Sequence, residues 1–282
     1  MLFIHSFVVA AIASLSLAQR ADFGPRVHMG PTRSGNDIVG LSTRFKPGYP
    51  PAREETFLAL WPGLWNANAA SYDLVQSVIS SHERSYMQYF CGARPGQWCM
   101  QPYVLRSWRP VTTPRGVPID GSDEILIEYR KDIAANGQWT QTLTNLSKNQ
   151  KLAPFKAGDK AATTFETGTE MQGTQRGSAD TQVYSNMTIT LRTADPSFGR
   201  TFRADPRVQT RPPVTPDAGK TWVFDLITIP AMLPGTQFKP AGGRSANVNS
   251  PEGVEGQEEE EEEVEFANPP AFQRVAVEAG AM

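Results

Sequence analysis

The sequence predicts an all-β protein: an antiparallel two-sheet β-sandwich or jelly roll, followed by a disordered acidic C-terminal tail. Apolar and polar residues alternate with a period of two in several segments, which are rich in Thr, Val, Ile, Tyr and Trp. Gly, Pro, Asn and Asp separate these segments, as turns require. No segment longer than about ten residues shows a helical stripe. The body of the chain, roughly 185 residues long, suits one all-β domain.

Residues 1–18 predict a secretory signal peptide. An apolar stretch runs to Leu17, and Ser16-Leu17-Ala18 places small residues at the two positions that a signal peptidase inspects. The stretch is too short and too rich in serine for a membrane span, and no later stretch approaches ~20 apolar residues. We therefore expect a soluble, extracellular protein without a membrane span.

The composition divides the rest of the chain into three parts. Residues 19–50 are polar and rich in Gly, Pro and Arg, which predicts a polar lead-in or a propeptide. The sandwich domain is expected over 51–234, and 235–250 has the composition of a linker. The tail over 251–282 holds ten Glu and one Arg, which leaves 26 basic and 19 acidic residues, a net charge of +7, in the first 250. Such a tail is typical of a solvated disordered segment.

Alternation is clearest in four segments after residue 120. In "DEILIEYRKDI" (123–133), Ile125, Ile127 and Tyr129 share one face. "QWTQTLTNLS" (138–147) and "VYSNMTITLRT" (183–193) alternate in the same way. "TWVFDLITIP" (221–230) is apolar on both faces, which predicts a strand that is covered on both sides.

Two cysteines, Cys91 and Cys99, predict one disulfide in an oxidising compartment, with a stabilisation of about 2–3 kcal/mol for so short a loop. The few histidines give no Cys/His cluster with zinc spacing, so we expect neither a metal nor a cofactor. Two Asn-x-Ser/Thr sequons, at Asn145 and Asn186, are candidate glycosylation sites that would have to lie on the surface.

A single glutamine interrupts an apolar run. In "YDLVQSVIS" (72–80), a strand would put Gln76 on one face with Leu74 and Val78. It lies on a wet face, in a groove, or against a partner, because a buried bare amide costs about 1–3 kcal/mol. An amide that faces a carboxylate can also do chemistry. The carboxylate takes a proton from water, and the amide N–H stabilises the oxyanion that develops on the attacked carbonyl.

Candidate carboxylates follow in "TTFETGTEMQ" (163–172). Glu166 and Glu170 share a face if this segment is a strand, about 13 Å apart at ~3.3 Å per residue. That separation exceeds the ~5–9.5 Å used by paired-carboxylate glycoside hydrolysis. A carboxylate here, together with a residue on another strand, remains a candidate site.

The ordered string of short motifs resembles the eqolisin-type glutamic peptidases, secreted fungal acid proteases with a concanavalin-A-like sandwich. The motifs are "WPG" at 61–63, Gln76 fifteen residues after Trp61, "GSDEILIEY" at 121–129, "WTQTLTNLSKNQ" at 139–150 and the glutamates of 163–172. The chain is also similar to a set of fungal secreted proteins of unknown function, through "GTEMQ" at 168–172 and "GKTW" at 219–222.

The resemblance implies an acid-acting, glutamic-peptidase-like hydrolase domain, active or inactive. Gln76 would polarise the scissile carbonyl, Glu170 (second choice Glu166) would be the general base, and Trp61 would line the cleft. Further substrate-binding candidates from "WCMQPYVLRSW" (98–108) are Trp98, Tyr103 and Trp108.

Two other functions stay open: a non-catalytic domain that binds cell-wall glycan through exposed aromatic residues, and a secreted effector-type protein. In each case the expected partner is a protein or polysaccharide outside the cell. Nucleic acid is not expected, because the basic residues are scattered and form no run interleaved with aromatics. We expect a monomer.

Overall fold

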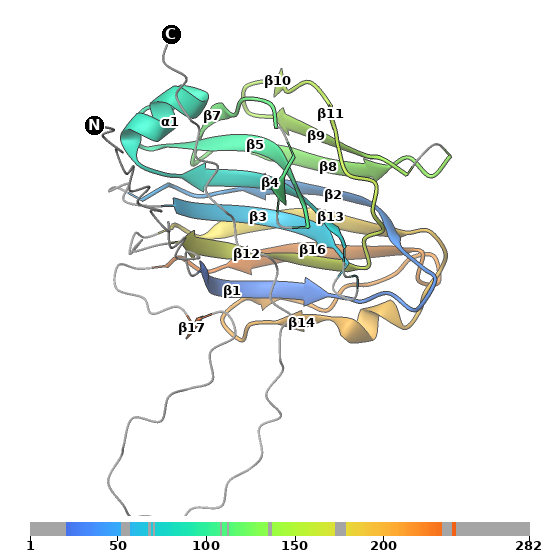
Figure 1. Cartoon of the computed structure of the whole chain (residues 1–282). Helices are drawn as coiled ribbons and strands as arrows, with labels where there is room; N and C mark the ends of the chain where they lie inside the picture. Colours follow the sequence, from blue (N-terminus) through green and yellow to red (C-terminus); the bar gives the residue numbers. More distant parts are fainter. Residues whose placement is uncertain are drawn as a thin grey trace, which may run out of the picture.

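The chain folds into two antiparallel sheets packed face to face, which confirms the predicted all-β sandwich (Figure 1). The computed structural model describes residues 21–51, 57–66, 69, 71–107, 109–111, 113–134, 137–172, 179–232 and 239–240. The predicted signal peptide and the acidic tail over 251–282 lie outside the described residues, and secretion stays a prediction. No helix in the described ranges is long and apolar enough to cross a membrane.

Sheet A carries the strands that matter for the candidate site. Its order is β14-β1-β12-β3-β4-β5-β6, with β17 added to β1 and β7 added to β5, and all its pairs are antiparallel. The strands are β1 (Ala21–Met29), β3 (Phe57–Trp65), β4 (Asp73–Ser81), β5 (Gln97–Arg106), β6 (Arg109–Pro110), β7 (Val117–Asp120), β12 (Thr164–Gln172), β14 (Arg203–Ala204) and β17 (Lys239–Pro240).

Sheet B is formed largely by the strands that the alternation predicted. Its order is β10-β9-β8-β2-β13-β16-β15, with β11 added to β9. The strands are β2 (Ile38–Lys46), β8 (Ile125–Lys131), β9 (Trp139–Asn145), β10 (Gln150–Lys151), β11 (Phe155–Lys156), β13 (Gln182–Leu191), β15 (Gln209–Thr210) and β16 (Thr221–Ile229). A short helix, α1 (Arg84–Cys91), connects β4 to β5, and a 3-10 turn, η1 (Phe198–Thr201), precedes β14.

The prediction of a lead-in or propeptide over 19–50 is wrong. Within it, β1 pairs with β12 in sheet A, while β2 lies between β8 and β13 in sheet B. Removing this segment would take a strand from each sheet. The predicted boundary at 234 is also too early, because β17 at Lys239–Pro240 pairs with β1.

The core lies between the sheets, and polar contacts link them across it. Ile125, Ile127 and Tyr129 of β8 are buried there, as their alternation predicted. The Tyr129 hydroxyl donates to the Pro62 carbonyl of sheet A at 2.9 Å. Gln141 of β9 donates through Nε2 to the Tyr103 carbonyl at 2.9 Å. Such bonds satisfy polar groups that burial would otherwise penalise.

A buried carboxylate fixes the start of β4. Asp73 accepts hydrogen bonds from Nε of Arg106 at 2.9 Å and from the backbone N–H groups of Asp159 and Lys160 at 2.6 and 2.9 Å. Burial alone would raise the pKa of Asp73, but these donors and the Arg106 charge outweigh it, so the pKa is lowered. The Asp73 cluster therefore joins β4, β5 and the loop before β12.

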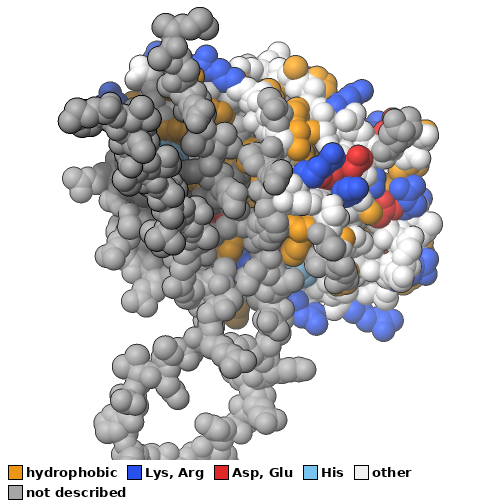
Figure 2. All heavy atoms as spheres, in the orientation of Figure 1, with side chains coloured by type: hydrophobic (Ala, Val, Ile, Leu, Met, Phe, Trp, Pro, Cys, Tyr) orange, Lys and Arg blue, Asp and Glu red, His pale blue; other side chains and the backbone are white. Residues whose placement is uncertain are grey.

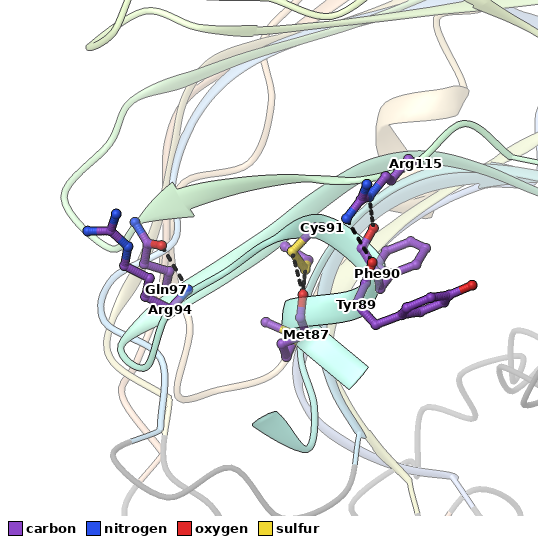
Figure 3. Close-up of a disulfide and its surroundings, with 8 residues drawn as sticks. Met87, Tyr89, Phe90, Cys91, Arg94, Gln97 and Arg115 are labelled. Carbon is purple, nitrogen blue, oxygen red and sulfur yellow. Dashed lines mark hydrogen bonds between the residues drawn. A yellow bond between two sulfur atoms is a disulfide. The ribbon is translucent and has the colours of Figure 1, made fainter. Parts of the chain in front are cut away.

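The predicted disulfide between Cys91 and Cys99 is present and joins the end of α1 to β5 (Figure 3). The Arg115 guanidinium donates to the carbonyls of Tyr89 and Phe90 at 2.9 and 3.1 Å, at the end of the same helix. These contacts hold the helix against sheet A.

Charged side chains are spread over the visible surface. On the face shown in Figure 2, Lys and Arg side chains lie at several separate places along the top, right and lower edges. The described part of this face therefore has no single basic patch of the kind that tracks a nucleic-acid backbone.

Candidate functional site

The candidate residues lie on the outer face of sheet A, the face that points away from sheet B. Successive residues of a strand point to opposite faces. Val75 belongs to the core between the sheets, and Ser77 donates through its hydroxyl to Oε1 of Gln141 in sheet B at 3.4 Å. Gln76, which lies between these two residues, therefore points to the outer face.

The strand register places five residues in one line across the sheet, which we call the central row: Tyr103, Gln76, Gly63, Glu166 and His28. Gln76 pairs with Tyr103 on one side and Gly63 on the other; Gly63 pairs with Glu166, and Glu166 with His28. Paired residues of antiparallel strands point to the same face. With strands ~4.8 Å apart, the Cα atoms of Gln76 and Glu166 are roughly 10 Å apart.

Gln76 is buried without compensation. Its side chain has no exposed surface, and neither Nε2 nor Oε1 has a hydrogen-bond partner among the residues that the structure describes. A buried amide in this state costs about 1–3 kcal/mol relative to a paired one. Native proteins rarely retain such a group without a functional reason.

Glu166 is also fully buried, and two basic side chains of β1 lie beside it. Nη1 of Arg26 donates to Oε1 at 2.9 Å. Nδ1 of His28 is 3.7 Å from Oε2, which is too long for a hydrogen bond. Oε2 has no hydrogen-bond partner in the described part of the chain. One oxygen of the carboxylate is thus engaged, and the other retains its lone pairs.

Gly63 contributes no side chain to the space between Gln76 and Glu166. A Cβ placed there would lie 3.1 Å from the Trp61 ring and 3.1 Å from a methyl group of Leu74, which is tighter than ordinary contact. The floor between the two polar side chains is therefore bare backbone, flanked by an indole and a leucine.

Aromatic and aliphatic side chains surround the central row, and burial in this cluster raises the pKa of Tyr72 to about 12. Trp61 is only 1% exposed, and its Nε1 has no partner among the described residues. Burial raises the pKa of Tyr103, with smaller contributions from Tyr86 and the charge of Glu170. The buried members of this outer cluster are Phe23, Ala59, Trp61, Trp65, Tyr72, Leu74, Val78, Tyr103 and Leu105.

Glu170, the first choice from the sequence, is not in the central row. It is buried on the same face of β12 but pairs with Ala59, four residues along the strand from Glu166. That offset is about 13 Å along the strand. The register thus aligns the second choice, Glu166, with Gln76, while Glu170 lies near enough to Tyr103 to affect its titration.

One of the predicted substrate-binding aromatics, Trp98, is not at this site. The prediction for Trp98 is wrong: it is fully buried between the sheets, and its Nε1 donates to the Gly48 carbonyl at 2.8 Å. It sits on the inward face of β5, whereas Tyr103 is on the outward face. Trp108 lies outside the described residues.

The sequence reasoning missed Arg26 and His28. Both lie in the segment that was expected to be a lead-in. The alternation of β1 is visible over 26–29, where Val27 and Met29 point into the core. An irregular register between Phe23 and Arg26 hides it further upstream.

The two sequons differ in accessibility. Asn145 is fully buried; its Nδ2 donates to Asp123 at 2.7 Å, and its Oδ1 accepts from the Lys148 N–H at 3.1 Å. This fold has no room for a glycan on Asn145, so the prediction of Asn145 as a glycosylation site is wrong. Asn186 is exposed at an irregularity of β13 with φ of 50°, and its glycosylation stays a prediction.

Within the described ranges, no group of three or more His, Cys, Asp or Glu side chains could hold a metal ion. The chemistry open to the site is that of an amide donor, a carboxylate and a neighbouring guanidinium.

No protein-family model and no curated protein matches the chain. Among solved structures, it is similar to scytalido-glutamic peptidase with a peptide-based transition state analog, at 11% identity and a TM-score of 0.44, covering 73% of this chain and 98% of that one. A second is SCP-B of the Eqolisin family with the tripeptide Ala-Ile-His, at 12% identity and a TM-score of 0.41, covering 73% of this chain and 98% of that one. A third is an alginate lyase with an alginate trisaccharide, at 8% identity and a TM-score of 0.30, covering 72% of this chain and 80% of that one. At these values none assigns an activity to this chain.

Proposed function

We propose that this protein is an acid-acting hydrolase that cleaves peptide bonds with Gln76 and Glu166 as its catalytic pair. One observation carries the proposal. A fully buried glutamine, whose amide has no hydrogen-bond partner among the described residues, lies in register with a buried carboxylate, and a glycine lies between them in the row. A fold that needed only stability would replace this amide by an apolar group of the same shape.

In the proposed reaction, Glu166 first accepts a proton and later returns it, and Gln76 donates a hydrogen bond to the carbonyl oxygen. Oε2 of Glu166 accepts a proton from water while the water oxygen bonds to the carbonyl carbon. The Nε2–H of Gln76 donates to the carbonyl oxygen as negative charge develops there. When the C–N bond then breaks, the Glu166 carboxyl returns its proton to the departing nitrogen.

The surroundings of the pair favour this chemistry. A donor that acts in a dry, apolar site stabilises a developing charge more strongly than it would in water. Trp61 and Leu74 supply apolar surface on the two sides of Gly63. Arg26 supplies a counter-charge to the buried Glu166 carboxylate, which could not otherwise be buried without a large penalty.

The glycan-binding alternative receives less support from the same face. A flat sugar platform requires exposed aromatic rings, but Trp61 and Trp65 are 1% and 5% exposed. The exposed large aromatics of the described chain are Tyr49 and Tyr89, and neither belongs to the outer cluster.

Digestion of an unfolded protein substrate between about pH 2.5 and 6, followed by mass spectrometry of the products, tests the proposal. Gln76→Leu is expected to lower kcat by about 10²–10³, the usual cost of removing one oxyanion donor. Glu166→Gln is expected to lower it by about 10²–10⁴ through loss of the general base. Matched controls are Gln150→Leu and Glu128→Gln, both at exposed strand positions, which should retain full activity.

Two results would refute the proposal. One is the absence of cleavage by the purified wild-type chain across the whole pH range. The other is cleavage that survives in both Gln76→Leu and Glu166→Gln at the rate of the exposed controls.

A further inference from the structure

Building on this proposed function, we propose that Arg26 is the positioning residue of the site. It holds Oε1 of Glu166 and thereby leaves Oε2 as the atom that takes the proton from water. Arg26 itself touches neither water nor substrate in this scheme. Its role is to fix which oxygen of the carboxylate reacts and where that oxygen lies.

The guanidinium of Arg26 is held on two sides. Its Nη1 donates to Oε1 of Glu166 at 2.9 Å, and its Cζ lies 4.9 Å from the centre of the Phe23 ring. The Arg26 and Glu166 side chains are 14% and 0% exposed. A charge-assisted bond in such a setting is strong and directional, because the alternative is a buried, unpaired charge. The carboxylate cannot turn without breaking this bond.

Gly168 makes the contact sterically feasible. It pairs with Arg26 across the sheet, two residues along β12 from the pair formed by Glu166 and His28. A Cβ at position 168 would lie 2.6 Å from Cγ of Arg26 and 3.2 Å from the Pro25 carbonyl. Any larger residue at 168 would therefore force the arginine side chain to shift without removing its charge. A substitution at Gly168 therefore displaces the Arg26 side chain while the arginine and its charge are retained.

Two other titratable neighbours among the described residues, Asp205 and His28, do not change which Glu166 oxygen is bound by Arg26. The pKa of Asp205 is lowered, first by its hydrogen bond with Arg207 and to a smaller extent by the charge of Arg26. Asp205 thus accepts a hydrogen bond from its own arginine, Arg207, and does not compete with Glu166 for Arg26. His28 lies 3.7 Å from Oε2 and forms no hydrogen bond with it.

The kinetic test compares Arg26→Gln, Arg26→Lys and Gly168→Ala with the wild type. A misplaced base is expected to lower kcat by about 10²-fold in Arg26→Gln, with KM little changed, since a displacement of about 1 Å has that cost. Arg26→Lys should recover part of the loss, because an ammonium keeps one donor. Gly168→Ala should reproduce the loss. Arg130→Gln, which removes an exposed arginine of β8 in sheet B, should retain wild-type kcat, and thermal unfolding should verify that each variant folds.

A crystal structure of Arg26→Gln separates this inference from the proposed function. We expect the Glu166 carboxylate to be turned from its wild-type orientation, whether or not the protein hydrolyses peptides. If it has turned and the wild type is inactive, the orientation by Arg26 is upheld and the proposed function fails. If the carboxylate keeps its place, or if kcat is unchanged in both Arg26→Gln and Gly168→Ala of an active enzyme, the inference is overturned.

Discussion

Replacing Gln76 with methionine should make the protein more stable while lowering its kcat by about 10²–10³, as expected for Gln76→Leu. Methionine has nearly the shape of glutamine but no polar amide to bury. Since neither amide atom of Gln76 has a partner in the described structure, the substitution removes a penalty and breaks no hydrogen bond. The expected gain is about 1–3 kcal/mol in the free energy of unfolding.

The same substitution at Gln141 is the matched control. Gln141 is also buried, but its Nε2 donates to the Tyr103 carbonyl at 2.9 Å, and its Oε1 accepts from Ser77 at 3.4 Å. Gln141→Met should therefore cost about 1–3 kcal/mol. The two variants make one chemical change with opposite expected signs.

Thermal and urea unfolding of the wild type and both variants measure this difference. For a domain of this size, each kcal/mol shifts Tm by about 2–4 °C, so Gln76→Met should raise Tm by roughly 2–12 °C. If Gln76→Met instead lowers Tm as far as Gln141→Met does, the Gln76 amide has a partner and the reasoning about its burial is wrong.

Three further perturbations follow from the same contacts. Gly63→Ala should lower kcat at least tenfold and cost about 1–3 kcal/mol by overpacking against the flanking indole and leucine, measured by kinetics and urea unfolding. Asp73→Asn should destabilise strongly near pH 6 and much less near pH 2. The lowered pKa of Asp73 beside Arg106 gives stability that is present above the unfolded-state value near 4 and is lost as the pH falls through the lower folded-state value, so pH-dependent unfolding provides the check. Replacing Cys91 and Cys99 together by Ala should lower the free energy of unfolding by about 2–3 kcal/mol without changing the pH profile of activity.

Four strands of sheet B, namely β8, β9, β13 and β16, could be predicted because each has one face on the core and one face more open to solvent. The expectation that β16 is covered on both sides is wrong, because Asp225 and Leu226 are exposed. Ile125, Ile127 and Tyr129 are buried while Glu128 and Arg130 are exposed, so the period of two is visible in the sequence. The strands β3 and β4 are covered on both faces, and their alternation is lost. Helix α1, with eight residues, is too short for its periodicity to stand out.

Only part of the candidate site could be predicted from the sequence. Gln76 stood out locally, as an amide in an apolar run. Its alignment with Glu166 depends on the register of three strands, which no local pattern encodes. Arg26 comes from a strand that the composition had placed outside the domain, and its partner is 140 residues away.

Hydrolysis rates of Glu166→Gln and Glu170→Gln, measured side by side at the optimum pH of the wild type, test the central claim most directly. Both changes remove one buried carboxylate from the same face of β12. Glu166 lies in register with Gln76 and is bonded to Arg26, whereas Glu170 lies four residues further along the strand. We expect Glu166→Gln to lose at least 10²-fold in kcat and Glu170→Gln to stay within about tenfold of the wild type. The reverse order, or equal rates in the two variants, would contradict the pairing of Gln76 with Glu166.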